Sequence, residues 1–312
     1  MYPVPNTPNL VNRTCFLLSS SFQIQRPLTS LVKCNRISLE KEKKKKKKKS
    51  DLHTTMATLM IPPVLSSPRD DAMHLYKAFK GLGCDTSAVI NILAHRDASQ
   101  RALIENEYKI MYSEDLTKRL SSELSGNLKK AVLLWMPDPA RRDAMILKET
   151  LTTDIDLKAA TEVICSRTPT QLQHLKQLYH VLFGSHLEHD IQTQTSGDLG
   201  QFLLAYLSTP RSEGCINGEM SGNFEHALVT VLQCAENPGK YFAKVMHRAM
   251  KGLGTNDKTL IRVIVTRTEI DMQYIKAEYY KKHHKSLNDV VHSETSDNYR
   301  TFLLSLLGPN QH

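Results

Sequence analysis

The sequence predicts an all-α protein built from repeats of about seventy residues, each with five short helices. Apolar residues recur at helical spacing through residues 56–308, and no segment of useful length alternates apolar and polar residues as a strand would. A set of landmark residues also recurs at a fixed distance, which is the signature of a repeat architecture.

The repeat period is read from matching residues. Arg96 and Arg167 are seventy-one residues apart, and so are Ser125 and Ser196. Each repeat has a tyrosine roughly ten residues after its landmark arginine; these are Tyr108, Tyr179 and Tyr279. These residues align three long copies of the repeat, and Arg267 with Tyr279 marks the third copy.

Helix start signals are clearest in the first repeat. Ser67 is a predicted N-cap, with Pro68 at the first helical position, and Asp97 with Gln100 is a predicted capping box. The residues expected to open the five helices are Ser67, Asp85, Asp97, Ser113 and Ser125. The residues expected to face the core in the third helix are Leu103, Ile104, Tyr108 and Met111.

The third repeat is predicted to be reduced to its last helix. Ser196 and Ser221 both open last-helix patterns but are only twenty-five residues apart, whereas Ser221 and Ser296 are separated by seventy-five. Roughly fifty residues are therefore missing. A skipped exon or a faulty gene model would explain the loss, and a genuine three-repeat protein is the alternative. The apolar face left bare would favour self-association.

These landmarks predict five segments. They are a disordered basic extension over 1–55, repeat 1 over 56–138, repeat 2 over 139–212, the remnant of repeat 3 over 213–237, and repeat 4 over 238–312.

A glycine loop occurs twice with one spacing to an acidic residue. Lys80-Gly81-Leu82-Gly83-Cys84 and Lys251-Gly252-Leu253-Gly254-Thr255 each follow an apolar helix. Glu123 and Glu294 lie forty-two positions beyond the first glycine of their loops. A single loop of this kind is most simply a helix C-cap, but the repeated spacing favours a metal site built twice.

Five helices per unit, with this loop after the first and an acid at the end of the fourth, resemble the annexin family over residues 56–308. The segments Met56-Ala57-Thr58-Leu59 and Ile92-Leu93-Ala94-His95-Arg96 resemble the plant branch. The resemblance implies a protein that docks reversibly on acidic phospholipid membranes when calcium is present. The sequence shows no catalytic constellation, so an enzyme is not expected, and its cysteine usage fits a reducing cytoplasm.

The resemblance also implies the calcium ligands. Calcium takes six to eight hard oxygens, and it accepts main-chain carbonyls together with a bidentate carboxylate. The implied ligands are the carbonyls of Phe79, Gly81 and Gly83 with the carboxylate of Glu123, and the carbonyls of Met250, Gly252 and Gly254 with the carboxylate of Glu294. Cys84 stands where the family usually has Thr. In repeat 2, Thr150-Leu151-Thr152-Thr153 replaces the loop and Gln194 replaces the acid, so no metal is expected there.

The formal charge lies in the first 55 residues. They carry twelve Lys and Arg against three acidic residues, a net charge of +9, whereas residues 56–312 balance at 29 basic and 29 acidic. The Lys43–Lys49 run could be a nuclear signal, a membrane clamp or translated untranslated sequence. A neutral repeat region argues against nucleic acid as a partner and indicates that attraction to lipid comes through calcium.

Three further sequence features suggest other activities. His95 matches a histidine proposed as a haem ligand in plant annexins, which would give peroxidase-like activity, although an imidazole also suits a helix C-terminus. Ile261-Arg262-Val263 resembles an annexin segment tied to actin, and it equally fits ordinary helix core. The six cysteines show no disulfide framework; Cys165 and Cys234 match suspected redox positions, but buried packing is their simpler role. A truncated, non-binding annexin product is the remaining alternative.

Overall fold

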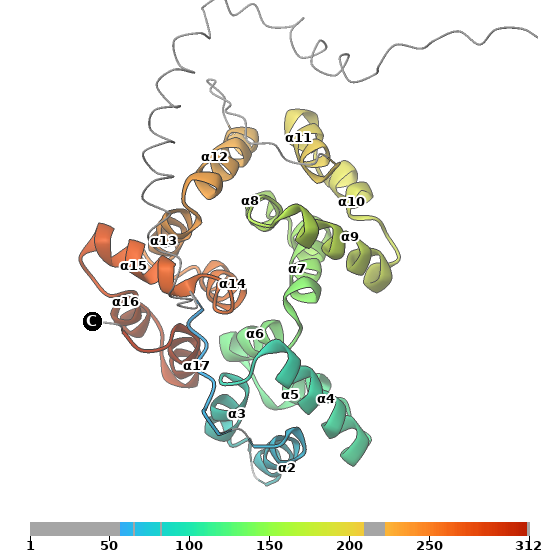
Figure 1. The fold of residues 1–312 in the computed structure, drawn as a ribbon, viewed down its shortest axis with the longest axis vertical. Coiled ribbons are helices and arrows are strands. Elements are labelled where there is room, and N and C mark those ends of the chain that lie inside the picture. Colours follow the sequence, from blue (N-terminus) through green and yellow to red (C-terminus); the bar gives the residue numbers. More distant parts are fainter. Residues whose placement is uncertain (1–56, 65, 82, 209–221, 311–312) are drawn as a thin grey trace, which may run out of the picture. The chain divides into compact units, whose positions relative to one another are not determined.

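The computed structural model describes residues 57–64, 66–81, 83–208 and 222–310, which all belong to one compact unit, Thr55–His312. These residues form sixteen α-helices and one short π-helix, and they contain no strand (Figure 1). The all-α prediction is confirmed. The predicted extension 1–55 lies outside the described residues.

Repeat 1 supplies five helices, namely α2 Pro68–Ala78, α3 Thr86–Leu93, α4 Ala98–Tyr112, α5 Leu116–Glu123 and α6 Gly126–Trp135. Repeat 2 supplies α7 Pro139–Lys148, the π-helix η2 Glu149–Thr153, α8 Leu157–Cys165, α9 Pro169–Phe183, α10 Leu187–Gln194 and α11 Gly197–Ser208. The remnant is α12 Gly222–Glu236, and repeat 4 comprises α13 Pro238–Ala249, α14 Asp257–Arg267, α15 Met272–His283, α16 Leu287–Glu294 and α17 Asp297–Leu307.

The helix starts follow local capping chemistry. The Ser67 side chain accepts a hydrogen bond from the Asp70 amide, and Asp97 and Gln100 form the predicted capping box. The prediction for Ser113 is wrong: it adopts a left-handed conformation with φ 53° at the end of α4, and Asp115 caps α5 instead.

The core-facing prediction for Leu103 is also wrong, because its side chain is 53% exposed. Ile104 and Tyr108 are fully buried, as predicted, and the third residue on this face is the buried Arg101. Adjacent side chains of a helix point in different directions, and the packing of α4 turns Ile104 rather than Leu103 toward the core.

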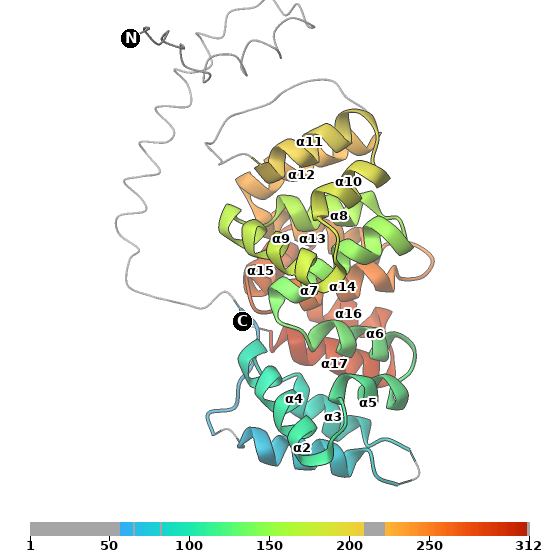
Figure 2. The ribbon, with the colours of Figure 1, turned by 90° about the vertical axis from the view of Figure 1, so that its right-hand side faces the viewer.

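The first and third helices of each repeat pack against each other. The pairs are α2 with α4, α7 with α9, and α13 with α15 (Figure 2). In repeats 1 and 2, the landmark arginine that follows the second helix pairs with an aspartate of the first helix: Arg96 pairs with Asp71, and Arg167 with Asp143. In repeat 4 the matching Arg267 pairs instead with Asp271, one turn later in the chain.

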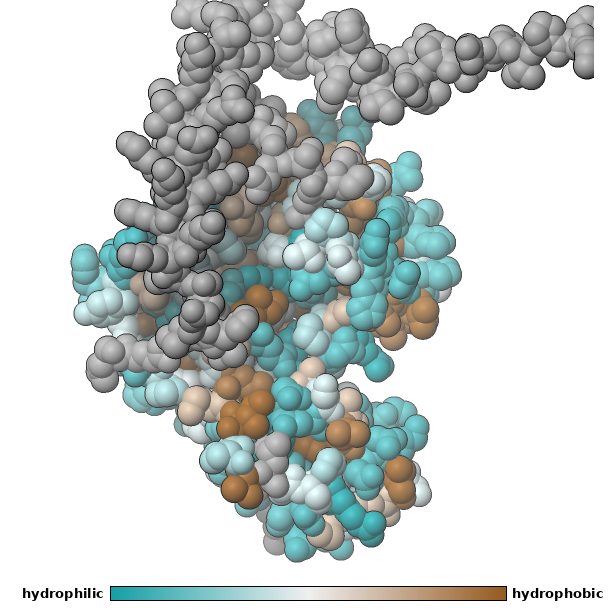
Figure 3. Space-filling view, viewed as in Figure 1, coloured by the Kyte–Doolittle hydropathy of each residue, from teal (hydrophilic) through white to brown (hydrophobic). Residues whose placement is uncertain are grey.

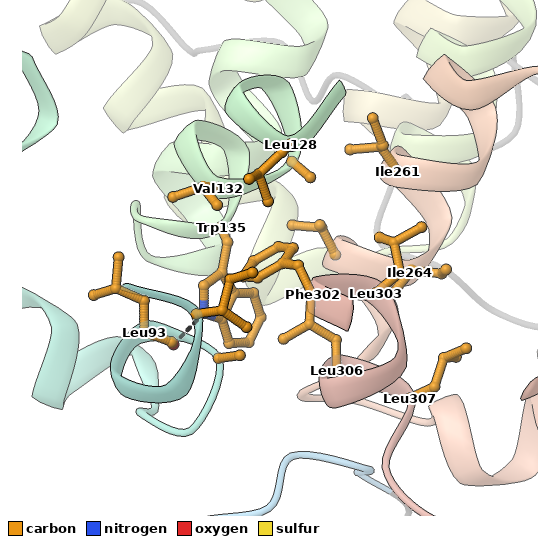
Figure 4. Close-up of a cluster of buried hydrophobic side chains, with 14 of the residues drawn as sticks. Leu93, Leu128, Val132, Trp135, Ile261, Ile264, Phe302, Leu303, Leu306 and Leu307 are labelled. Carbon is orange, nitrogen blue, oxygen red and sulfur yellow. Dashed lines mark hydrogen bonds between the residues drawn. The ribbon is translucent and has the colours of Figure 1, made fainter. Parts of the chain in front are cut away.

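The largest hydrophobic cluster joins repeats 1 and 4. Its centre lies between α3, α6, α14 and α17, where Trp135 and Phe302 are fully buried (Figure 4). The indole Nε1 of Trp135 donates a 2.8 Å hydrogen bond to the carbonyl of Leu93, which satisfies the one polar atom of that side chain. A second cluster lies within repeat 2 and takes in Ala227 of α12.

A charged cluster lies where repeats 1, 2 and 4 meet. The Glu269 carboxylate lies 3.3 Å from Arg101 and 3.4 Å from Arg142, and both arginine side chains are almost fully buried. Both guanidinium groups also lie over the Trp135 ring, at 3.7 and 5.0 Å from its centroid. One carboxylate from repeat 4 thus forms ion pairs with one buried arginine from repeat 1 and one from repeat 2.

The remnant helix α12 fills the space between repeats 2 and 4. It packs against α8 and α11 on one side and α13 on the other. Ala227, Leu228 and Thr230 are buried, whereas Val229 and Leu232 remain 37% and 36% exposed. On the face drawn in Figure 3, hydrophobic residues lie in small groups separated by hydrophilic ones. The remnant therefore buries one face between repeats 2 and 4 and leaves Val229 and Leu232 partly exposed.

Candidate functional site

The glycines of the two loops have closely similar backbone conformations. The loops connect α2 to α3 and α13 to α14, with φ angles of 121° and 93° at Gly81 and Gly83 and of 117° and 89° at Gly252 and Gly254. L-residues with side chains rarely adopt such angles. A Cβ atom added at any of these four positions would meet nothing within 4 Å, so backbone conformation and not space requires glycine.

Each loop is closed at its base by a main-chain hydrogen bond. The Asp85 amide donates to the Ala78 carbonyl at 2.8 Å, and the Asn256 amide donates to the Ala249 carbonyl at 2.7 Å. Beyond this closure in the second loop, Lys251 and Leu253 are exposed, Leu253 completely. Leu82 of the first loop lies outside the described residues. The second loop thus projects a cation and an apolar side chain into solvent.

Glu294 lies beside the second loop. It is the last residue of α16, and its Oε2 atom accepts a 2.8 Å hydrogen bond from the Thr255 hydroxyl. A residue thirty-nine positions further along the chain is therefore brought to the end of the glycine loop by the packing of repeat 4.

Glu123 lies beside the first loop, with a cation between them. Arg119, one turn earlier on α5, places its Nη2 atom 2.9 Å from Glu123 Oε1 and 3.1 Å from the carbonyl oxygen of Phe79. The carbonyl and the carboxylate predicted as metal ligands thus converge on one cationic nitrogen. Cys84 lies nearby: burial, and then the charge of Glu123, raise the pKa of its thiol.

The donor set suits a hard cation. Among the described residues, no group of three or more His, Cys, Asp or Glu side chains could hold a metal ion. A metal at these loops would need main-chain oxygens together with one carboxylate, and calcium tolerates such a set better than magnesium, which demands near-ideal octahedral geometry. The convergence of the Phe79 carbonyl and Glu123 on a guanidinium nitrogen shows that this arrangement accommodates positive charge.

Repeat 2 has a different structure at the matching place. The π-helix Glu149–Thr153 extends α7 where the other repeats have a glycine loop. Lys258 of repeat 4 pairs with Glu149 and Asp154 at its two ends, and Lys148 pairs with Asp190. Gln194 is exposed at the end of α10.

The remaining sequence-predicted residues lie elsewhere in the unit. His95 Nδ1 lies 3.0 Å from the Asn91 carbonyl at the end of α3, which is the geometry of an imidazole at a helix C-terminus. Arg262 is 7% exposed and pairs with Glu162, between the buried Ile261 and Val263. This segment is helix core. Cys165 is buried, and burial raises the pKa of Cys234 to about 12.

Arg119 lies in the candidate site at the first loop and was not predicted from the sequence. The available signal was a basic residue four positions before Glu123 on a helix, a spacing that places the two side chains on one face. The sequence does not reveal that the same side chain reaches the Phe79 carbonyl, forty residues earlier in the chain.

The annexin family model matches residues 70–135, 142–206 and 241–306. Annexin D5 of Arabidopsis thaliana is 48% identical over 315 aligned positions, which take in 82% of this chain and all of that protein. Roughly 60 of those positions therefore have no residue in this chain, as expected for a shortened repeat.

Solved structures show the same relationship. Annexin III superposes with a TM-score of 0.77 at 28% identity, covering 82% of this chain and 98% of that one. Chicken annexin V in complex with Zn2+ gives a TM-score of 0.77 at 29% identity and covers 82% and 99% of the two chains.

Proposed function

The chain belongs to the annexin family, and on that premise we propose that it binds acidic phospholipid membranes when calcium is present, through the loops of repeats 1 and 4. One observation carries this proposal. Two loops with closely similar pairs of positive φ angles each lie next to a glutamate that is far from them in the sequence. The membrane association would be peripheral. No helix of the described part of the chain is long and apolar enough to cross a bilayer.

The proposed ligands are the main-chain oxygens and the glutamate of each loop. They are Phe79, Gly81, Gly83 and Glu123 in repeat 1, and Met250, Gly252, Gly254 and Glu294 in repeat 4. Bound calcium would supply the positive charge that attracts a lipid phosphate. The protein orients this charge, because Phe79 and Met250 are buried and fix the start of each loop against the core.

The loop tips support a membrane role. Lys251 is exposed and can meet an anionic headgroup, while the fully exposed Leu253 can enter the apolar side of the interface. An exposed leucine at the tip of a loop gains nothing from the folded protein itself. A lipid surface gives it a favourable environment.

Co-sedimentation with vesicles tests the proposal. The full chain is mixed with phosphatidylserine–phosphatidylcholine vesicles in calcium or in chelator, as the wild type and as the double variant Glu123→Gln/Glu294→Gln. A double variant at two glutamates away from the loops, Glu107→Gln/Glu225→Gln, is the charge-matched control.

We expect the wild type and the control to pellet in calcium, and the loop variant to remain in the supernatant. Binding through the lysine-rich segment would occur equally in chelator and would fall with added salt, so it is separated from calcium-dependent binding. The proposal fails if the folded loop variant pellets with calcium as well as the wild type does.

Other predicted activities stay predictions. A haem titration tests the peroxidase-like alternative at His95, and sedimentation velocity tests self-association through the surface around the shortened repeat. A proposed actin contact through Ile261-Arg262-Val263 would require these buried residues to leave the core, so this structure favours their packing role.

A further inference from the structure

We propose that Arg119 is a built-in competitor for calcium at the first loop, so that the two loops fill at different calcium concentrations and the loop of repeat 4 fills first. This inference rests on the proposed function, because it concerns the affinity of the same two loops. It names Arg119 as the residue that sets the difference between them.

The geometry places Arg119 where calcium would bind. A single atom, Nη2, lies within 3.1 Å of both the Phe79 carbonyl oxygen and the Glu123 carboxylate. The Arg119 Nε atom is buried and has no hydrogen-bond partner among the described residues, so the guanidinium group is not held by a full set of bonds of its own. The Nη1 atom lies 3.7 Å from Glu114. Calcium can take the two shared oxygens only if the guanidinium group moves away.

The second loop lacks this competitor. The glycines and glutamates of the two loops are offset by 171 residues, and the same offset places Val290 opposite Arg119. Val290 packs against the hydrophobic core. Glu294 accepts a hydrogen bond from the neutral hydroxyl of Thr255 and has no ion-pair partner among the residues that the structure describes. Calcium therefore displaces no charge at the second loop.

The expected size of the effect is moderate. The Arg119 side chain is 34% exposed, so solvent screens its pair with Glu123, although the bond to the Phe79 carbonyl adds to the cost of displacement. Pairs of this kind shift an equilibrium by about threefold to tenfold. Both loops keep a similar donor set, so Arg119 alone would produce a difference of that size.

Single-loop variants separate the two affinities. Calcium is titrated calorimetrically into the full chain carrying Glu294→Gln, which leaves only the first loop, and into the chain carrying Glu123→Gln, which leaves only the second. Each is compared with and without Arg119→Gln. Lys118→Gln is the control, because it removes one positive charge from an exposed position on the same helix without touching the bridged oxygens.

We expect Arg119→Gln to lower the dissociation constant of the first loop by about threefold to tenfold and to leave that of the second loop unchanged. Lys118→Gln should change neither by more than about twofold, since it acts only through screened charge. Hydrogen exchange in chelator gives a second readout. Peptides that span Phe79–Asp85 should exchange faster in Arg119→Gln, whereas those that span Met250–Asn256 should not.

The outcomes distinguish this inference from the function on which it rests. If both loops bind calcium and Arg119→Gln leaves the first unchanged or weakens it, Arg119 is not a competitor and the inference is overturned. If neither loop binds calcium in any folded variant, the proposed function is overturned as well. Should Arg119→Gln lose helicity, Arg119→Met replaces it. Methionine keeps an apolar stem on α5 but removes the charge and the hydrogen-bond donors, so a dissociation constant equal to that of the wild type would count against the inference.

Discussion

Replacing Glu269 with glutamine is expected to destabilise the folded unit strongly. Its carboxylate faces the guanidinium groups of Arg101 and Arg142, and it also accepts a hydrogen bond from the Ala98 amide at 3.1 Å. Both arginine side chains are at most 1% exposed. Burial already lowers the pKa of Arg142 to about 10, and the neighbouring Arg101 charge contributes to this shift. The variant would leave two buried positive charges with no facing carboxylate.

The magnitude follows from the burial of the pair. Breaking a buried ion pair by removing one partner costs about 3–5 kcal/mol, because the remaining charge stays desolvated. Each kcal/mol lowers the melting temperature of a unit of this size by about 2–4 °C, which gives a decrease of roughly 10 °C. Main-chain carbonyls of Trp135 and Pro137 accept from Arg142 and reduce the loss without neutralising the charge.

Thermal and urea unfolding followed by circular dichroism measure this loss in the full chain. The control is Glu236→Gln, which removes an exposed pair with Lys240 and should cost less than about 1 kcal/mol. If Glu269→Gln costs no more than this control, the carbonyls and the Trp135 ring are sufficient for both arginines, and the reasoning from the buried charge is wrong.

Two further outcomes are expected. Burial raises the pKa of Cys234 to about 12, so little thiolate forms near neutral pH. Iodoacetamide should therefore modify Cys234 far more slowly in the native protein than in urea, which mass spectrometry can follow. Equal rates would contradict the burial argument. His247 and His283 stack with ring centroids 3.9 Å apart, and burial and neighbouring positive charges lower the pKa of both. The unfolded chain therefore binds more protons just below pH 6.5, and stability should fall as the pH drops through that window. The double variant His247→Tyr/His283→Tyr copies the stacked Tyr76 and Tyr112 of repeat 1. Its unfolding midpoint should decrease less between pH 7 and pH 5 than that of the wild type. An equally steep decrease would count against this assignment.

The parts of the fold that follow local rules were predictable. Asp97 and Gln100 satisfy each other's backbone amides within one turn, so two residues three positions apart are enough to identify the start of α4. The start of α5 was misplaced because Ser113 and Asp115 both have capping side chains, and the choice depends on the left-handed turn that ends α4.

The residues that sequence patterns could not predict are placed by contacts between segments far apart in the chain. The buried face of α4 includes Arg101, which is stable there because Glu269 lies beside it, 168 residues away. Likewise, the spacing of Gly81 and Glu123 predicts a paired loop and acid, but only the packing of α5 against the loop brings Arg119 to the Phe79 carbonyl. Periodicity indicates which side of a helix faces inward, but it misplaced Leu103 and does not identify the residues that an inward-facing side chain contacts.

The position of α12 has a consequence for how arrays of this kind can be shortened. This helix contacts α8 and α11 before it and α13 after it, and the Tyr241 hydroxyl joins Thr230 of α12 to Glu162 of α8. The last helix of a repeat therefore joins neighbouring repeats to each other, whereas the helices that precede it in a full repeat can be lost. A protein engineer who deletes modules from such an array should cut ahead of the final helix and preserve it as the joint.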